Sequence, residues 1–218
     1  MSRLCRALGG LFLMMPFLLA TALAKGSVTG WPDLNWGADT AKLDRLFGAR
    51  LDRLDPPWQF GPFEARRSLP DGMLGAIAYR VFFQMNGVNA ASGQAGLQQI
   101  LLERRHAAAT PNVFEKTLQF LSRHYGSPNQ ECLTGRWRTA AGDPAVAEAF
   151  WQLAENKMHL SFLNFRSSEI LYLDPNKPID PLVPEADRRI IHPNLMPQRI
   201  LLRIYPAARR DLDRPLRC

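Results

Sequence analysis

Cysteine and histidine are scarce in this chain of 218 residues, which has three cysteines and four histidines. Metal sites usually leave pairs of His or Cys at short spacing, whereas here the histidines stand singly, at His106, His124, His159 and His192. Neither Ser92 nor Ser161 has the glycine context of a nucleophile elbow. Gly72-Met73-Leu74-Gly75 lacks the lysine of a phosphate-binding loop. We therefore expect no metal, no cofactor and no catalytic motif, although a triad assembled from distant residues would leave no spacing to detect.

Long apolar runs are also missing, except at the N-terminus. Arg3 and Arg6 precede the run Leu8–Ala20, and Ala22-Leu23-Ala24 ends it with the small residues that a signal peptidase requires. Cys5 precedes the run, so it is not the cysteine of a lipoprotein leader. We expect residues 1–24 to be a signal peptide and the mature protein to be periplasmic or secreted, with no membrane span after cleavage. The alternative is a retained anchor, which the shortness of the run disfavours.

The charge balance is basic. The whole chain has 27 Lys and Arg against 20 Asp and Glu. Cleavage would remove Arg3 and Arg6, which leaves a formal charge of +5. This excess favours anionic envelope polymers or lipid head groups as partners, and the alternative is a solvated basic surface. Export argues against nucleic acid as a partner.

Two cysteines, Cys132 and Cys218, remain after cleavage. In an oxidising envelope they could form a disulfide. The link would close a long loop and be worth up to about 4 to 5 kcal/mol by the loop-entropy model. The alternatives are a buried free Cys132 with an unpaired Cys218, or a disulfide between two chains.

Two helices are predicted from apolar spacing between capping residues. The first begins at Asp39 or Thr40 and ends at Gly48, and the second begins after Thr110 and ends at Gly126. Their apolar faces comprise Leu43, Leu46 and Phe47 in the first helix, and Phe114, Leu118, Leu121 and Tyr125 in the second.

Strands are predicted after each helix. Asp55-Pro56-Pro57 blocks regular structure, and Pro70-Asp71-Gly72 indicates a turn. The first set of strands comprises Phe63–Leu69, Ala76–Met85 and Leu97–Arg105, of which the last two form an antiparallel hairpin. The second set comprises Leu133–Thr139, Val146–Leu153 (a strand or a short helix), Met158–Leu163 and Glu169–Leu173.

The order of elements therefore occurs twice, with Gly48 and Gly126 as the corresponding helix ends. We predict an α+β fold of two sequential helix-plus-antiparallel-sheet units, residues 25–109 and 110–175, followed by a proline-rich basic C-terminal arm, residues 176–218. In this arm, Arg199–Tyr205 is predicted to add an edge strand or to lie along the surface.

The first helix also carries a family resemblance. Gly37 and the apolar spacing that ends at Gly48 resemble the helical signature of the small lipoprotein of the outer-membrane β-barrel assembly machine. A similar unit is duplicated in the secreted β-lactamase inhibitory protein. Tyr125-Gly126-Ser127-Pro128 resembles the Leu-Gly-x-Pro that ends the family helix, whereas Arg50 replaces that proline in the first unit.

The resemblance implies an antiparallel sheet covered by helices and a role in binding envelope proteins without catalysis. This chain departs from the family in having no lipobox, in having one clear helix per unit where two are usual, and in its C-terminal arm. The resemblance assigns no binding residues.

Two groups of residues are candidates for binding. Arg104 and Arg105 follow the predicted hairpin, and Arg136 and Arg138 flank Trp137. Arginine forks recognise carboxylates and phosphates, although Trp137 could instead pack inward. The second group is aromatic and either forms an exposed strip or covers the open side of the sheet; it comprises Trp31, Trp36, Trp58, Phe60 and Phe63.

From the sequence we predict an exported, non-catalytic envelope protein that binds a protein or an anionic polymer. The alternative is a periplasmic hydrolase whose catalytic groups come from separate segments, around His106, His124 or His159.

Overall fold

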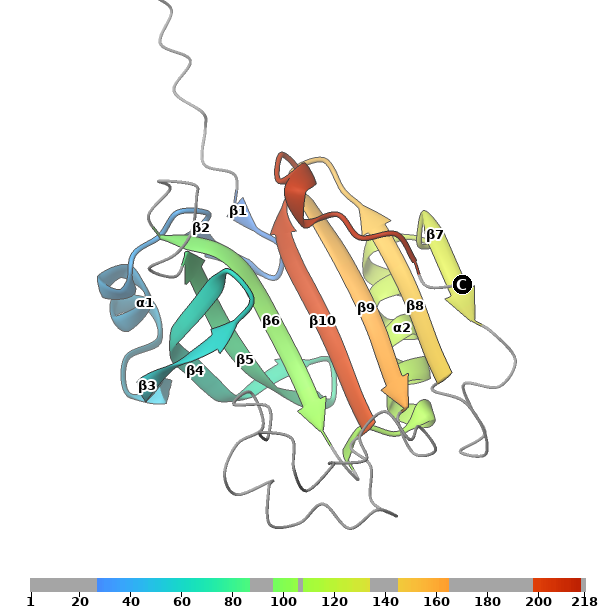
Figure 1. Cartoon of the computed structure of the whole chain (residues 1–218), viewed down its shortest axis with the longest axis horizontal. Helices are drawn as coiled ribbons and strands as arrows, with labels where there is room; N and C mark the ends of the chain where they lie inside the picture. Colours follow the sequence, from blue (N-terminus) through green and yellow to red (C-terminus); the bar gives the residue numbers. More distant parts are fainter. Residues whose placement is uncertain (1–26, 87–95, 106–107, 134–144, 165–197, 217–218) are drawn as a thin grey trace, which may run out of the picture.

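The computed structural model describes residues 27–86, 96–105, 108–133, 145–164 and 198–216. Within these ranges the protein has an α+β fold, in which eight antiparallel strands form one open sheet and two α-helices lie on one of its faces (Figure 1). We call this face the helical face and the opposite one the outer face. The predicted signal peptide lies outside the described residues. None of the described helices has the length and apolarity needed to span a membrane.

Both predicted helices are confirmed. α1 (Thr40–Phe47) begins after Asp39, whose carboxylate accepts a hydrogen bond from the Lys42 N–H at 2.7 Å. α2 (Pro111–Tyr125) begins after Thr110, whose hydroxyl accepts one from the Val113 N–H at 3.3 Å. The glycine that follows each helix has a positive φ, 53° and 84° respectively, which a side chain would disfavour.

The strands of the sheet follow the order β3-β4-β5-β6-β10-β9-β8-β7, and every neighbouring pair is antiparallel. Four strands follow α1 and four follow α2, and the two sets meet where β6 pairs with β10 (Figure 1). The strands are β3 (Asp52–Phe60), β4 (Phe63–Leu74), β5 (Ile77–Asn86), β6 (Leu97–Arg105), β7 (Gln130–Leu133), β8 (Ala145–Gln152), β9 (Asn156–Asn164) and β10 (Gln198–Pro206). A separate hairpin near the N-terminus consists of β1 (Ser27–Val28) and β2 (Trp31–Asn35).

The predicted hairpin of β5 and β6 is confirmed. Val146–Leu153, which the sequence predicted as either a strand or a short helix, forms most of the strand β8. The sequence did not predict β3, because it contains Asp55-Pro56-Pro57; β3 is an edge strand, where proline is tolerated. The predicted turn at Pro70-Asp71-Gly72 is wrong. These residues lie within β4, where the register shifts between Leu69 and Gly72, and the turn follows at residues 75–76.

The prediction of an edge strand or a surface segment at Arg199–Tyr205 is also wrong. This segment forms most of β10, which lies in the centre of the sheet between β6 and β9. β7 begins at Gln130, ahead of the predicted start at Leu133, and residues 134–144 lie outside the description. The predicted strand Glu169–Leu173 also lies outside the described residues.

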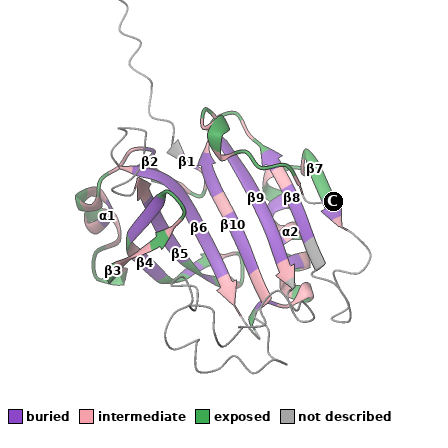
Figure 2. Ribbon diagram, in the orientation of Figure 1, coloured by how far each residue is buried: buried purple, intermediate pink, exposed green. Residues whose placement is uncertain are grey.

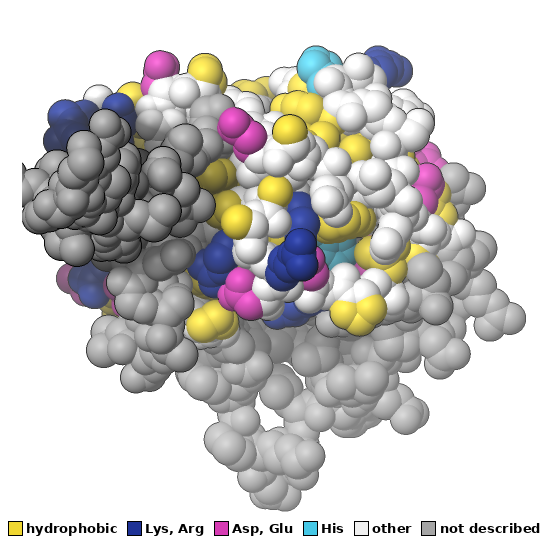
Figure 3. Space-filling model, turned by 90° about the horizontal axis from the view of Figure 1, so that it is seen from above, with side chains coloured by type: hydrophobic (Ala, Val, Ile, Leu, Met, Phe, Trp, Pro, Cys, Tyr) yellow, Lys and Arg dark blue, Asp and Glu magenta, His cyan; other side chains and the backbone are white. Residues whose placement is uncertain are grey.

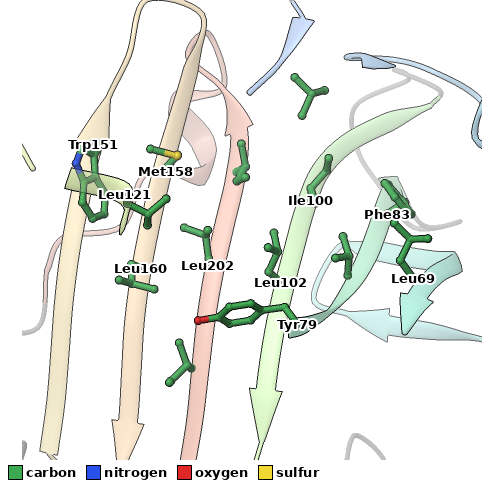
Figure 4. Packing of buried hydrophobic residues seen from close by; sticks show 14 of the residues in the cluster. Leu69, Tyr79, Phe83, Ile100, Leu102, Leu121, Trp151, Met158, Leu160 and Leu202 are labelled. Carbon is green, nitrogen blue, oxygen red and sulfur yellow. The ribbon is translucent and has the colours of Figure 1, made fainter. Parts of the chain in front are cut away.

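Alternation along the central strands produces the main hydrophobic core. Burial is deepest along these strands, whereas much of β3 and β7 at the two edges is exposed (Figure 2). Strand residues on the helical face pack against both helices and the N-terminal hairpin. In Figure 4 several of them lie side by side across the sheet. They include Tyr79, Val81, Phe83, Ile100, Leu102, Met158, Leu160, Phe162, Ile200, Leu202 and Ile204.

Each helix covers a different half of this face. The ring centroids of Phe47 in α1 and Phe83 in β5 are 5.1 Å apart, and those of Phe114 in α2 and Phe162 in β9 are 5.9 Å apart. α1 is also held to β4 by an ion pair, because Arg67 Nε and Nη2 donate to the two carboxylate oxygens of Asp44 at 2.7 and 2.9 Å. This hydrogen bonding lowers the pKa of Asp44. The helices are therefore fixed on either side of the sheet centre.

The outer face has a smaller apolar cluster. It comprises Ala65, Phe82, Leu101 and Leu201. Trp58 of β3 stacks on Phe82 with ring centroids 4.3 Å apart, while Trp36 and Phe63 are buried. Trp58 therefore covers part of the outer face, as the second of the two sequence interpretations expected, whereas Trp36 belongs to the main core of the helical face and Trp31 is only partly buried.

A buried hydroxyl pair joins α2 to β5. The Tyr79 and Thr117 hydroxyl oxygens are 2.5 Å apart. Thr117 donates its own hydrogen to the Val113 carbonyl at 2.8 Å, so Tyr79 is the donor in the pair. Burial raises the pKa of Tyr79 to about 12, and the hydroxyl therefore stays protonated at physiological pH. In Figure 4 the Tyr79 ring extends from β5 past β6 toward β10.

We expect Thr117→Val to destabilise the protein more than Tyr79→Phe. Tyr79→Phe removes one hydrogen bond, at a cost of about 0.5 to 1.5 kcal/mol, whereas Thr117→Val leaves a buried hydroxyl without its acceptor, at about 1 to 3 kcal/mol. Urea denaturation gives the free energy of unfolding of each variant. The double variant should lose less stability than the two single variants lose together. Tyr125→Phe is the control, with less than about 0.5 kcal/mol expected. If the two single variants lost equal stability and their losses added fully in the double variant, the Tyr79–Thr117 hydrogen bond would be contradicted.

Candidate functional site

The helical face contains a cavity of about 300 Å³ between the two helices, over the centre of the sheet. We call it the central cavity. Its floor comes from β6, β9, β10 and β4, one wall from α1 and the short helix η1 (Gly48–Arg50), the other wall from α2, and one end from the turn between β1 and β2. Its lining comprises Thr29, Gly30, Trp31, Phe47, Arg50, Leu69, Gly72, Met73, Leu74, Leu102, Leu121, Tyr125, Met158, Leu202 and Ile204.

The pairing of β6 with β10 fixes the middle of the floor. Leu102 lies directly opposite Leu202 in the register, and the two lie on neighbouring strands in Figure 4. Phe47 and Tyr125, each the last residue of its helix, form opposite walls. The backbone of Gly72 lies directly against the Val81 side chain, because a Cβ at Gly72 would lie 2.2 Å from Val81 Cγ2. The cavity is therefore bounded by residues from both halves of the sheet and from both helices.

The chemistry of the lining is apolar with a single positive charge. Arg50 is exposed, and no aspartate or glutamate is among the lining residues. Thr29 and Tyr125 supply hydroxyl groups, and burial raises the pKa of Tyr125, so its hydroxyl stays a neutral donor at neutral pH. Met73 is 60% exposed, the only large apolar side chain so exposed in the described ranges. The lining thus suits an apolar ligand with an acceptor group at one end.

The central cavity is large beside the usual packing of a protein interior. Interiors are close-packed, with few voids larger than a water molecule, whereas this cavity measures about 300 Å³ and opens to solvent at the exposed Arg50 and Met73. The central cavity is therefore the strongest candidate for a binding site in the described chain.

A cluster of polar side chains lies on the outer face. His159 Nε2 is 3.3 Å from Glu148 Oε1, and the two side chains are only 7% and 4% exposed. Ser161 is the next residue but one after His159 on β9, on the same face, and it pairs in register with Glu148. A histidine with an acidic and a hydroxyl neighbour is the arrangement that the hydrolase alternative requires.

The space at this cluster is small. Arg203, together with Arg214 and Pro215 of the C-terminal segment, helps to enclose about 30 Å³, the share of one water molecule in the liquid. The segment that follows η4 (Arg210–Leu212) is held there by Asp213, which pairs with the buried Lys157 at 2.6 Å. The end of the molecule that carries η4 shows basic and acidic side chains next to one another (Figure 3). A substrate has no room beside His159, so the arrangement fits a structural pair.

The two arginines predicted at the end of β6 are not brought together. Arg104 donates to the Ala108 carbonyl at 2.9 Å, and its guanidinium carbon lies 5.7 Å from the centroid of the Tyr79 ring. Arg105 lies on the outer face, where it pairs with the buried Glu103 at 2.8 Å, and Arg199 pairs with the same carboxylate. Both predicted residues are thus engaged within the protein.

Of the remaining sequence-predicted site residues, Cys132 lies within the described residues. Arg136, Trp137 and Arg138 lie outside the described residues. Cys132 is buried on β7 and disulfide-bonded, and its partner lies outside the description, so its pairing with Cys218 stays a prediction.

The other histidines form no site in the described part of the chain. His124 is exposed at the end of α2, and its Nδ1 lies 2.8 Å from the Phe120 carbonyl oxygen. His106 and His192 lie outside the description. Within the described ranges, no three or more His, Cys, Asp or Glu residues come together as metal ligands.

Sequence reasoning missed the central cavity. Of its lining, Phe47, Leu121 and Tyr125 were predicted on helix faces and Trp31 in the aromatic group, but nothing in the sequence indicated that they meet at one site. It also treated His159 as isolated, because Glu148 becomes its neighbour only through the β8–β9 pairing. That hairpin was the available signal for the pair, since β8 and β9 are joined directly by residues 153–155.

Comparisons with known proteins add no constraint: no family model, curated protein or solved structure matches the chain.

We expect Leu202→Phe to stabilise the ligand-free protein, because the added atoms enter the central cavity and recover packing. Leu160→Phe is the control, since Leu160 is fully buried in the same core but does not line the cavity, and overpacking costs about 1 to 3 kcal/mol. Unfolding in urea measures both variants. An equal loss of stability in the two would show that the cavity is not available to a side chain.

Proposed function

We propose that this chain is an exported envelope protein that acts by binding and has no catalytic centre. Its ligand site is the central cavity, and its partner is an envelope protein or an anionic envelope polymer that presents an apolar group. The observation that carries this proposal is the character of the cavity: about 300 Å³, lined by apolar side chains and one arginine, with no carboxylate or histidine in the lining. General acid–base catalysis most often uses a histidine or a carboxylate, and the two hydroxyl groups of the lining, those of Thr29 and Tyr125, have neither as a neighbour within the lining to activate them.

The hydrolase alternative receives less support. Its best residues, His159, Glu148 and Ser161, surround a space for one water, and the structure describes no hydrogen bond between Ser161 and His159. Nucleophilic catalysis by serine depends on that bond.

We also propose that the chain consists of two helix-plus-sheet units that share one sheet. The element order supports this, since each helix is followed by four strands, and the first four strands mirror the last four about the β6–β10 pair. Leu102 and Leu202 would then be equivalent residues at the centre, as would Phe47 and Tyr125 before the two glycine caps. The central cavity would lie where the units meet.

Export is supported by two features. Residues 1–24 have the sequence pattern of a signal peptide. Cys132 is disulfide-bonded, which is typical of an oxidising compartment.

A photo-crosslinking amino acid at Met73 tests the binding proposal. Met73 lines the central cavity and is exposed, so a crosslinker there should form adducts with envelope components in living cells. Gln152 is an exposed residue at the end of β8 and does not line the cavity, so a crosslinker at that position is the matched control. Adducts at Met73 but not at Gln152, visible as a mass shift, are expected. Equal labelling at both positions, or none at either, would refute the proposal.

A serine-directed fluorophosphonate probe tests the alternative. We expect no labelling of the wild-type protein, because Ser161 is buried and has no room for the probe. Labelling that disappears in both Ser161→Ala and His159→Ala, with the folded state confirmed by circular dichroism, would favour the hydrolase and end the non-catalytic proposal.

A further inference from the structure

The ligand chemistry of the central cavity follows from its volume, its lining and its one charge. A methylene group takes roughly the 30 Å³ that a water molecule takes in the liquid, so 300 Å³ holds a chain of about ten carbons. A lipid with two long chains exceeds this volume several-fold. The ligand that fits is therefore a single chain.

The lining favours an aliphatic chain. The floor and walls are formed chiefly by leucine and methionine with one isoleucine, and three aromatic residues also line the cavity, Trp31, Phe47 and Tyr125. Leu102, Leu202 and Met158 are almost completely buried, so they lie beneath the cavity as a closed apolar floor. The cavity opens to solvent at the exposed Arg50 and Met73, so an apolar ligand would gain contacts with the lining and displace water from it.

The charge at the opening sets the head group. Arg50 is exposed, lines the cavity and has no acidic partner in the described part of the chain. A single guanidinium matches the single charge of a carboxylate, which it can hold with two parallel hydrogen bonds. With no acidic residue in the lining, nothing there repels an anion.

We propose that the central cavity binds a medium-chain fatty acid, with about ten carbons over Leu102 and Leu202 and its carboxylate at Arg50. The proposal rests on the proposed function only in taking this cavity as the ligand site. It specifies the apolar group as the alkyl chain of a fatty acid. The exposed Met73 is an apolar surface at the site where the chain enters.

Calorimetric titration of the protein, purified from the envelope fraction and stripped of lipid, tests this. We expect the Kd to fall by about fourfold for each added methylene from hexanoate to decanoate, and to fall no further from dodecanoate to hexadecanoate. Decanol should bind at least fivefold more weakly than decanoate, because it lacks the charge. An affinity that keeps rising to hexadecanoate, or no saturable binding of decanoate at millimolar concentration, would overturn the proposal.

Two variants with one control locate the ligand. Arg50→Glu should weaken decanoate at least tenfold and leave decanol unchanged, whereas Arg53→Glu, an exposed arginine outside the lining, should change neither. Leu202→Trp should abolish the binding of both ligands by filling the cavity. Since Arg50 is on the surface, its variant stays informative even where Leu202→Trp fails to fold. An equal effect of Arg50→Glu and Arg53→Glu would overturn the assignment of the carboxylate.

The outcome is separable from that of the proposed function. Crosslinking at Met73 without decanoate binding would refute the fatty acid and retain the central cavity as a binding site. Neither crosslinking nor binding would refute both.

Discussion

The pairing of β6 with β10 is the contact on which the rest of this structure depends. It joins the four strands that follow α1 to the four that follow α2, and it is made by segments far apart in the sequence, with Leu102 opposite Leu202. Without it, each half would expose an edge strand and half of an apolar sheet face. Because the pairing fixes the register of both halves, it also fixes how far apart the two helices lie.

That separation produces the central cavity. α1 has eight residues and α2 has fifteen. α1 packs on its own half through Phe47 on Phe83. α2 packs on its own half through Phe114 on Phe162 and also reaches β5 of the other half, where Thr117 pairs with Tyr79. The sheet centre is left between them, covered in part by the N-terminal hairpin, which is held by a 2.7 Å hydrogen bond from Trp36 to Asn156. A core optimised only for packing would fill this space. Here the strands supply leucine and isoleucine to a floor that neither described helix covers.

The sequence predicted local structure well and long-range pairing poorly. Caps and apolar spacing gave both helices with the observed ends, and alternation gave β5, β6 and β9, because these signals lie within about ten neighbouring residues. β10 was misplaced at an edge, since its flanking prolines say nothing about which strands lie beside it. The central cavity was missed for the same reason: Thr29, Arg50, Tyr125 and Leu202 meet only once the strand order is known.

The two faces of the sheet differ in whether their charged groups have partners within the protein, and this difference indicates which face binds a ligand. On the outer face, charged side chains are buried with partners of opposite sign: Glu103 with Arg105 and Arg199, and Lys157 with Asp213. Removing one member of such a pair leaves an uncompensated buried charge, so this face is committed to its own internal contacts. The helical face has the opposite character, an apolar cavity whose lining includes a cation, Arg50, with no acidic partner among the described residues. A ligand that brings both an alkyl chain and a negative charge would complete the packing and the charge balance of the helical face together, which no internal contact in the described chain does.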